Sequence, residues 1–185
     1  MTDPIHQQLA DKYQQMMALQ QEIMALQAAA PKQTVEDYAL TDWSGAKPPL
    51  SALFGAKDDL ILIHNMGFSC PYCTMWADGF NAVLPHIEER AAVVLTSPDD
   101  VSAQKTGAEK RGWTFRMLSN TGTSLNKDMG FEGEDGGPMP GCTVFHRNDD
   151  GTIVRYASAP FGPGDKFCSV FSFFELLPPE GENGR

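Results

Sequence analysis

A pair of cysteines separated by two residues constrains the fold of this chain most strongly. Cys70 and Cys73 follow residues 59–65, an apolar run rich in β-branched residues that predicts a buried strand. Behind them, large apolar residues recur at three- and four-residue steps, the pattern of an amphipathic helix: Trp76, Phe80, Val83, Leu84 and Ile87. Two cysteines with this spacing at a strand-to-helix turn predict a dithiol/disulfide redox site.

Helix geometry predicts different roles for the two cysteines. Residues at positions i and i+3 lie on one face of a helix, so the two sulfurs can meet. We expect Ser69 to cap this helix, and Pro71 is tolerated in its first turn. Unpaired amides and the positive end of the helix dipole favour a thiolate on Cys70, and the thiolate is the nucleophile. We therefore expect Cys70 to attack a substrate disulfide and Cys73 to resolve the mixed disulfide.

Two other interpretations of the cysteines stay open. The four cysteines of the chain, Cys70, Cys73, Cys142 and Cys168, could form a zinc-stabilised domain, although structural zinc sites usually use two close pairs. Alternatively, Cys70 and Cys73 are a packed pair in a non-catalytic or redox-responsive dimeric binding protein. The strand before and the helix after them favour the redox interpretation, with no metal and no cofactor.

Composition narrows the choice of partner and location. The chain of 185 residues carries 24 acidic and 14 basic residues and a formal net charge of -10, which disfavours nucleic acid and anionic membranes as partners. No apolar segment approaches the roughly 20 residues that span a bilayer. The first residues lack the basic and apolar stretches of a secretory signal. We expect a thiol-reducing, cytoplasmic location, with a protein or small-molecule disulfide as the substrate.

A long amphipathic helix is predicted at the N-terminus, over residues 4–29, ahead of Pro31. Its apolar residues follow alternating three- and four-residue steps that only Lys12 interrupts: Ile5, Leu9, Met16, Leu19, Ile23 and Leu26. At ~39 Å the helix is longer than a small domain easily covers. We therefore predict a homodimer, antiparallel or swapped, and the alternative is a helix packed on its own domain.

The rest of the chain predicts an α/β domain. Residues 1–31 would form the N-terminal helix and dimer contact, residues 32–179 the domain, and residues 180–185 a disordered tail. Strands and helices alternate after the dithiol, which predicts parallel pairing, and a β-hairpin and a last helix follow. The predicted strands are residues 91–96, 114–118, 142–147 and 152–157, and the predicted helices start at 97–100, 124 and 167.

This order of elements is that of the thioredoxin-like fold, a central mixed sheet flanked by helices. In that fold a cis-proline opens the strand that faces the dithiol. Pro140 is the matching residue, so we predict a cis bond between Met139 and Pro140, with Pro138 as second choice. Cys142 follows two residues later and would lie near Cys70.

Particular strings of residues resemble the thioredoxin-like family catalogued as domain of unknown function 899. The similarity spans about residues 10 to 178, and it implies a peroxiredoxin-related fold with an N-terminal helix but no settled activity or substrate. The main strings are residues 60–64 and 70–81. Shorter ones support them: residues 42–45, 53–55, 111–113, 125–128 and 140–145.

Two related activities are not supported by their motifs. Cys-Pro-Tyr-Cys is also the glutaredoxin tetrapeptide, but glutaredoxins bind glutathione with a Thr-Val-Pro strand start, and here Met139 precedes Pro140. Peroxiredoxins carry Pro-x-x-x-Thr-x-x-Cys ahead of the peroxidatic cysteine. Counting back from Cys70 places Gly67 at the threonine position, which disfavours direct peroxide reduction.

Four further side chains have a functional and a structural interpretation each. His64 could assist proton transfer at Cys70 or be a core histidine with satisfied hydrogen bonds. Asp78 could lie buried beneath the site as proton acceptor for Cys73 or face solvent. Cys142 and Cys168 could take part in the chemistry or be small buried side chains.

Overall fold

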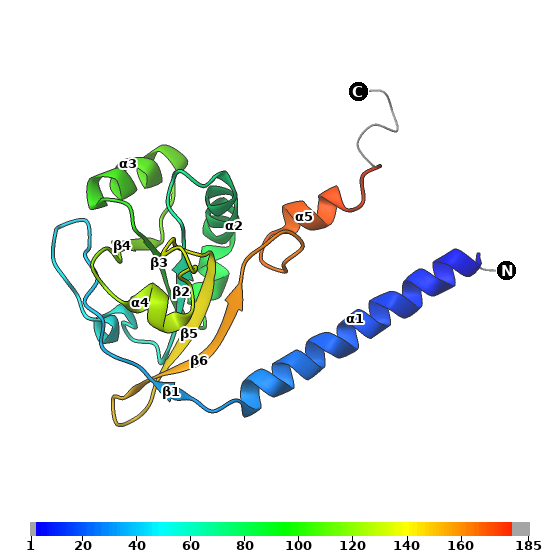
Figure 1. Ribbon diagram of the computed structural model, residues 1–185, viewed down its shortest axis with the longest axis horizontal. Helices are drawn as coiled ribbons and strands as arrows, with labels where there is room; N and C mark the ends of the chain where they lie inside the picture. The colour runs from blue at the N-terminus through cyan, green and yellow to red at the C-terminus, as the bar shows by residue number, and fades with distance from the viewer. Residues whose placement is uncertain (1–2, 179–185) are drawn as a thin grey trace. The chain divides into compact units, whose positions relative to one another are not determined.

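The computed structural model describes residues 3–178 (Figure 1). Two compact units divide the chain: the first ends at Gln33 and the second begins at Thr34. The first unit contains helix α1 (Pro4–Ala29), which Asp3 caps by accepting a hydrogen bond from the Ile5 amide. The predicted disordered tail, residues 180–185, lies outside the described residues.

The second unit is built on a mixed sheet, as predicted; the sheet has six strands in the order β1-β6-β5-β2-β3-β4. The pairs β2–β3 and β3–β4 are parallel, whereas β2–β5 and β5–β6 are antiparallel. The predicted strands are therefore confirmed to within a few residues. The strands are β1 (Gln33–Thr34), β2 (Asp59–His64), β3 (Ala92–Ser97), β4 (Arg116–Ser119), β5 (Gly141–Arg147) and β6 (Ile153–Pro160).

Helix α3 starts and stops where the sequence offers caps. Asp100 caps α3, and Gly112 ends it in the left-handed conformation at φ 67. The last helix starts two residues later than predicted because the Asp165 carboxylate accepts the amides of Phe167 and Cys168, which holds these two residues in a turn. The described part of the chain contains no helix long and apolar enough to cross a membrane. The remaining helices are η1 (Leu50–Leu53), α2 (Pro71–Glu88), α3 (Val101–Arg111), α4 (Leu125–Met129) and α5 (Ser169–Phe174).

Alternation along β2 divides the core into two layers, one on each side of the sheet. Ile61 and Ile63 face the layer that contains α2, and Leu60 and Leu62 face the layer that contains η1 and α4. The α2 layer includes Cys73, Trp76, Phe80, Leu95, Met117 and Cys142. The opposite layer includes Leu50, Leu53, Leu118, Leu125, Met129 and Phe145.

Gly141 opens β5 at a place where no side chain fits. A Cβ atom there would overlap the Phe131 ring and come within 2.7 Å of the Ala159 carbonyl oxygen. We expect Gly141→Ala to lower the free energy of unfolding by about 2–3 kcal/mol, because the backbone of β6 cannot move aside cheaply. Urea denaturation measures this. Gly162→Ala is the matched control, since a Cβ at Gly162 meets nothing within 4 Å; equal losses for the two variants would contradict the packing at Gly141.

Candidate redox site

The two predicted cysteines meet at the start of α2. Cys70 is the N-cap residue, with extended backbone at φ -95 and ψ 107, and its Sγ accepts a hydrogen bond from the Cys73 amide at 3.1 Å. Ser69 therefore does not cap the helix, and that prediction was wrong. Pro71 occupies the first helical position, so the cap is Cys70, the residue just before it. The Cys70 sulfur accepts the exposed amide three residues further on.

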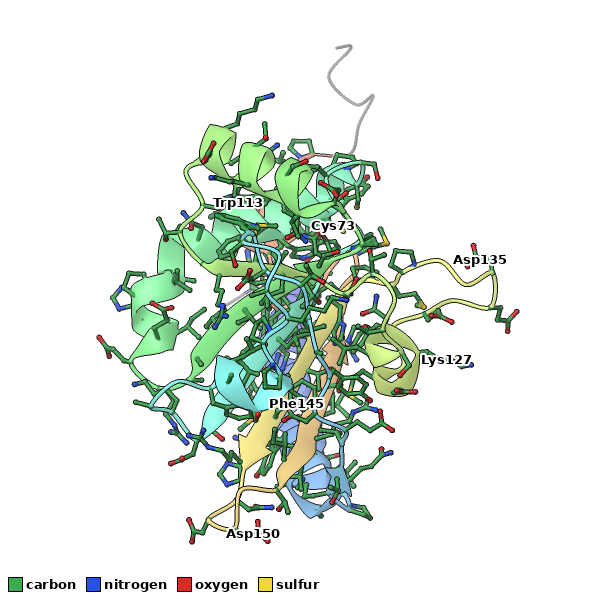
Figure 2. The ribbon with its side chains drawn as sticks, turned by 90° about the vertical axis from the view of Figure 1, so that its left-hand side faces the viewer. Cys73, Trp113, Lys127, Asp135, Phe145 and Asp150 are labelled. Atoms are coloured by element: carbon green, nitrogen blue, oxygen red, sulfur yellow. The ribbon has the colours of Figure 1, made fainter. Side chains whose placement is uncertain are left out.

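Burial separates the two thiols. Cys70 is partly exposed, whereas only 1% of Cys73 is exposed. Burial, and then the adjacent Cys70 side chain, raise the pKa of Cys73 to about 12. Cys73 lies toward the end of the sheet opposite to the β5–β6 turn that carries Asp150 (Figure 2). Cys73 is thus held as a protonated thiol beside a more accessible sulfur that caps a helix.

A polar loop between β2 and α2 fixes the position of the dithiol. Asn65 donates from Nδ2 to the Cys73 carbonyl at 3.2 Å, and its Oδ1 accepts the Gly67 amide at 2.7 Å. Asp99 accepts the Phe68 amide at 3.1 Å. Gly67 adopts φ 103, and a Cβ there would lie 2.8 Å from Asp99 Oδ1. Sequence reasoning missed Asn65 and Asp99; an asparagine directly after a buried strand was the available signal.

Cys142 lies on the same face of the sheet as Cys73. It pairs with Ile63 across β2 and β5, is 6% exposed, and belongs to the same apolar cluster as Cys73. Burial raises the pKa of Cys142 to about 11. Its placement at the dithiol end of the sheet follows the prediction, and its part in the chemistry stays a prediction.

The predicted cis bond before Pro140 was wrong, because no peptide bond between residues 3 and 178 is cis. The Met139 amide donates to the Phe131 carbonyl at 2.9 Å, and the Pro140 carbonyl accepts the Phe161 amide at 3.0 Å. These two bonds hold the trans chain on either side of the proline. The bond before Pro138, the second choice, is also trans, and Pro138 forms an isolated antiparallel bridge with Glu132.

His64 is a core histidine. Its ring nitrogens lie 2.9 Å from Asn126 Oδ1 and 2.9 Å from Thr143 Oγ1, and the ring stacks on Phe131. These contacts lie on the sheet face opposite to Cys73, among the η1 and α4 layer. Burial lowers the pKa of His64 to about 4. The structure therefore agrees with the interpretation of His64 as a core histidine with satisfied hydrogen bonds, and it gives no support to proton transfer by His64.

Asp78 lies at the surface, so of its two interpretations the structure matches the solvent-facing one and not burial beneath the dithiol. Its Oδ1 accepts the Trp113 indole N–H at 2.7 Å, and its Oδ2 pairs with Arg111 at 2.7 Å. The Asp78 side chain is 47% exposed. Asp78 stands two turns beyond Cys70 on the helix face that meets α3, which explains why it ties the two helices together instead of reaching the sulfurs.

A groove runs beside the first turns of α2. It has a volume of about 700 Å³ and lies between α2 and residues 166–170. Cys168, which is buried, and Pro71 and Thr74 of α2 all line it. Phe171 follows the groove-lining residues 166–170 in the chain. The centroid of its ring lies 6.4 Å from that of Tyr72 and 5.9 Å from that of Trp76. Sequence reasoning did not anticipate this groove because it joins segments nearly a hundred residues apart.

The ligand set for a zinc-stabilised domain is not assembled. Among residues 3–178, no three or more His, Cys, Asp or Glu side chains gather as they would around a metal ion. All four cysteines are free thiols.

The parallel β2–β3–β4 unit, the antiparallel β5–β6 pair and a dithiol at the start of α2 define a thioredoxin-like protein. The chain belongs to the family described as bacterial protein of unknown function (DUF899), whose model matches residues 5–185. The resemblance seen in the sequence is confirmed.

Curated relatives are peroxiredoxins. Peroxiredoxin Q, chloroplastic, of Arabidopsis thaliana is 26% identical over 144 residues, which are 77% of this chain and 66% of that protein. The same protein of Suaeda salsa is 23% identical over 141 residues, 76% of this chain and 65% of that one. The chain thus spans just under two thirds of the length of these relatives.

Solved structures share the fold. Peroxidoxin BcpB from Mycobacterium tuberculosis has a TM-score of 0.57 and 25% identity, covering 80% of this chain and 97% of that chain. PrxQ from Xylella fastidiosa, solved as a cysteine-to-serine mutant, has a TM-score of 0.61 and 18% identity, covering 78% and 92%.

Proposed function

We propose that this protein is a thiol-disulfide oxidoreductase in which Cys70 is the nucleophile and Cys73 the resolving thiol. The observation that carries the proposal is the hydrogen bond from the Cys73 amide to Cys70 Sγ at 3.1 Å. An amide donor at a helix N-terminus stabilises negative charge on the sulfur that it contacts. Cys73 is in the opposite situation: its thiol is buried, and burial disfavours the thiolate.

The reaction has two displacements. The Cys70 thiolate attacks one sulfur of a substrate disulfide, forms a mixed disulfide and expels the other half as a thiolate. That departing thiolate takes the Cys73 proton. The Cys73 thiolate then attacks Cys70 Sγ, releases the remaining half and leaves a Cys70–Cys73 disulfide. The substrate gains two electrons, and an external dithiol reductant returns two electrons to the protein.

The groove beside α2 supports a disulfide substrate with an apolar flank. Its wall includes Phe80, Val83 and Val170, together with the charged side chains of Arg111 and Lys166. A protein segment or a small organic disulfide could lie there while one sulfur reaches Cys70. We place the reaction in a thiol-reducing cytoplasm, where free cysteines persist.

Peroxide reduction by Cys70 is the second candidate, favoured by the peroxiredoxin relatives. In that reaction the thiolate would attack one peroxide oxygen, form a sulfenic acid and release water, and Cys73 would condense with the sulfenic acid. The peroxidatic motif is missing, however, with Ile63 and Gly67 where proline and threonine would stand. We therefore rank it below disulfide reduction.

Turnover of a chromogenic aromatic disulfide, in the presence of dithiothreitol, tests the proposal. Cys70→Ser is expected to lower the rate at least about a hundredfold, because an alcohol does not replace the thiolate. Cys142→Ser is the comparison, since it removes a buried thiol of the same layer. An unchanged rate gives Cys142 a structural role, and a lowered rate gives it a part in the chemistry. If Cys70→Ser and Cys142→Ser both kept full turnover, the dithiol role would be refuted. Turnover of hydrogen peroxide without turnover of the disulfide would favour the second candidate.

A further inference from the structure

The apolar stripe of α1 has no buried member. Among the described residues, none of the α1 side chains is buried, and those of its stripe are exposed by 48% at Met16 up to 71% at Leu26. Figure 1 shows α1 as one unbroken helix. Apolar residues that recur at alternating three- and four-residue steps, here with Lys12 as the one exception, are typical of the seam of a coiled coil. Three further apolar residues beside the stripe widen it: Tyr13, Met17 and Met24.

We propose that α1 pairs with α1 of a second copy of this chain, and that the two helices are antiparallel. The residue that decides the direction is Lys12, the one charged member of the repeat. In a parallel pair, Lys12 would pack against the partner's Lys12, which places two like charges in the seam. In an antiparallel pair, each Lys12 faces a different part of the partner helix.

One antiparallel register gives Lys12 a partner. If Lys12 lies opposite the partner's Ile23, its side chain enters the hole formed by four residues of that helix, the partner's Leu19, the partner's Glu22, the partner's Ile23 and the partner's Leu26. The lysine stem then packs on apolar side chains while the ammonium group reaches the partner's Glu22. Each pair has two such contacts, one at each end.

The same register covers the apolar residues. Leu9 lies opposite the partner's Leu26, and Met16 lies opposite the partner's Leu19. Shifting one helix by a heptad in either direction would move Lys12 more than a turn from the partner's Glu22. Depending on the direction, it would also leave Leu26 or Leu9 without an opposite residue in the partner's α1. Among the described residues, neither Lys12 nor Glu22 forms an ion pair within its own chain. Lys12 donates to Gln15 Oε1 at 3.1 Å, an exposed contact between neutral and charged side chains that the contact with the partner's Glu22 would replace.

Charge reversal in the full-length protein tests the proposal, with sedimentation equilibrium under reducing conditions as the readout. The wild type is expected at twice the chain mass of 20.2 kDa. Lys12→Glu places like charges together and should raise the dimer dissociation constant about tenfold or more, as should Glu22→Lys. The double variant restores both contacts and should return to near the wild-type dissociation constant.

Two controls accompany the charge reversals: a substitution away from the seam and a measurement of helix content. Gln14→Glu adds charge on the opposite face of α1 and should leave the dissociation constant unchanged. Circular dichroism shows that the helix content is kept, since Lys and Glu are both good helix formers. A monomeric wild type at micromolar concentration would overturn the proposal. So would a dimer that the single reversals do not weaken, which would point to another surface, or a double variant that is not rescued, which would point to a parallel or swapped arrangement.

Discussion

Cys73→Ser is expected to stop the proposed reaction halfway, with Cys70 still joined to one half of the substrate. In the wild type, Cys73 is one helical turn from Cys70, and its amide already contacts the Cys70 sulfur at 3.1 Å. Release of the mixed disulfide is therefore intramolecular, and such reactions gain several orders of magnitude over bimolecular ones. Without the second thiol, we expect the mixed disulfide to persist about 10³-fold longer.

Mass spectrometry of the intact protein measures the trapped species. Treatment of Cys73→Ser with the aromatic disulfide should add the mass of one half, and cleavage into peptides should place it on Cys70. Cys142→Ser, treated in the same way, should add no lasting mass because Cys73 is still present. A Cys73→Ser protein that clears the adduct as fast as the wild type would show that another group resolves it.

Acid is expected to weaken the fold through His64. The folded-state pKa of His64 is lowered to about 4 from 6.5, so between these pH values the unfolded chain binds a proton that the folded chain does not. The free energy of unfolding therefore falls as the pH drops from about 6.5 to about 4. Because the ring is 1% exposed, the full difference applies, about 3 kcal/mol in total.

Urea denaturation at several pH values between 7 and 4 measures the effect. His64→Gln is less stable at pH 7 because it loses the fit between Asn126 and Thr143, but its stability should depend less steeply on pH than that of the wild type. His86→Gln, an exposed change on α2, should keep the wild-type slope. Parallel curves for the wild type and His64→Gln would contradict the buried, neutral histidine.

The residues that define local periodicity were sufficient to predict the fold. The alternation of β2, the helical repeat after Cys73 and the strand–helix alternation as far as α4 all report which face of an element is apolar. These patterns gave the mixed sheet and the dithiol at the start of α2. Such a pattern can be read within a single helix or strand, because each element must bury its own apolar face whatever its distant contacts are.

The sequence was insufficient where a contact between residues far apart in the chain decides the local structure. The sequence left Asp78 as either a buried acceptor or a solvent-facing carboxylate, and its contacts with the Trp113 indole and Arg111 at the surface decide between the two. Pro140 was expected to be cis by fold analogy, but hydrogen bonds to Phe131 and Phe161 hold its neighbourhood with trans peptides. Asn65 and Asp99 were missed because their partners are loop amides whose orientation no periodic pattern reports.

Cysteine pairing after mild oxidation tests the central claim most directly. The reduced protein is treated with one equivalent of the aromatic disulfide, quenched with an alkylating agent, digested and mapped by mass spectrometry. We predict a Cys70–Cys73 disulfide, with Cys142 and Cys168 recovered as alkylated thiols. A disulfide that joins Cys70 to Cys142 or to Cys168, or four cysteines recovered unpaired, would contradict the account.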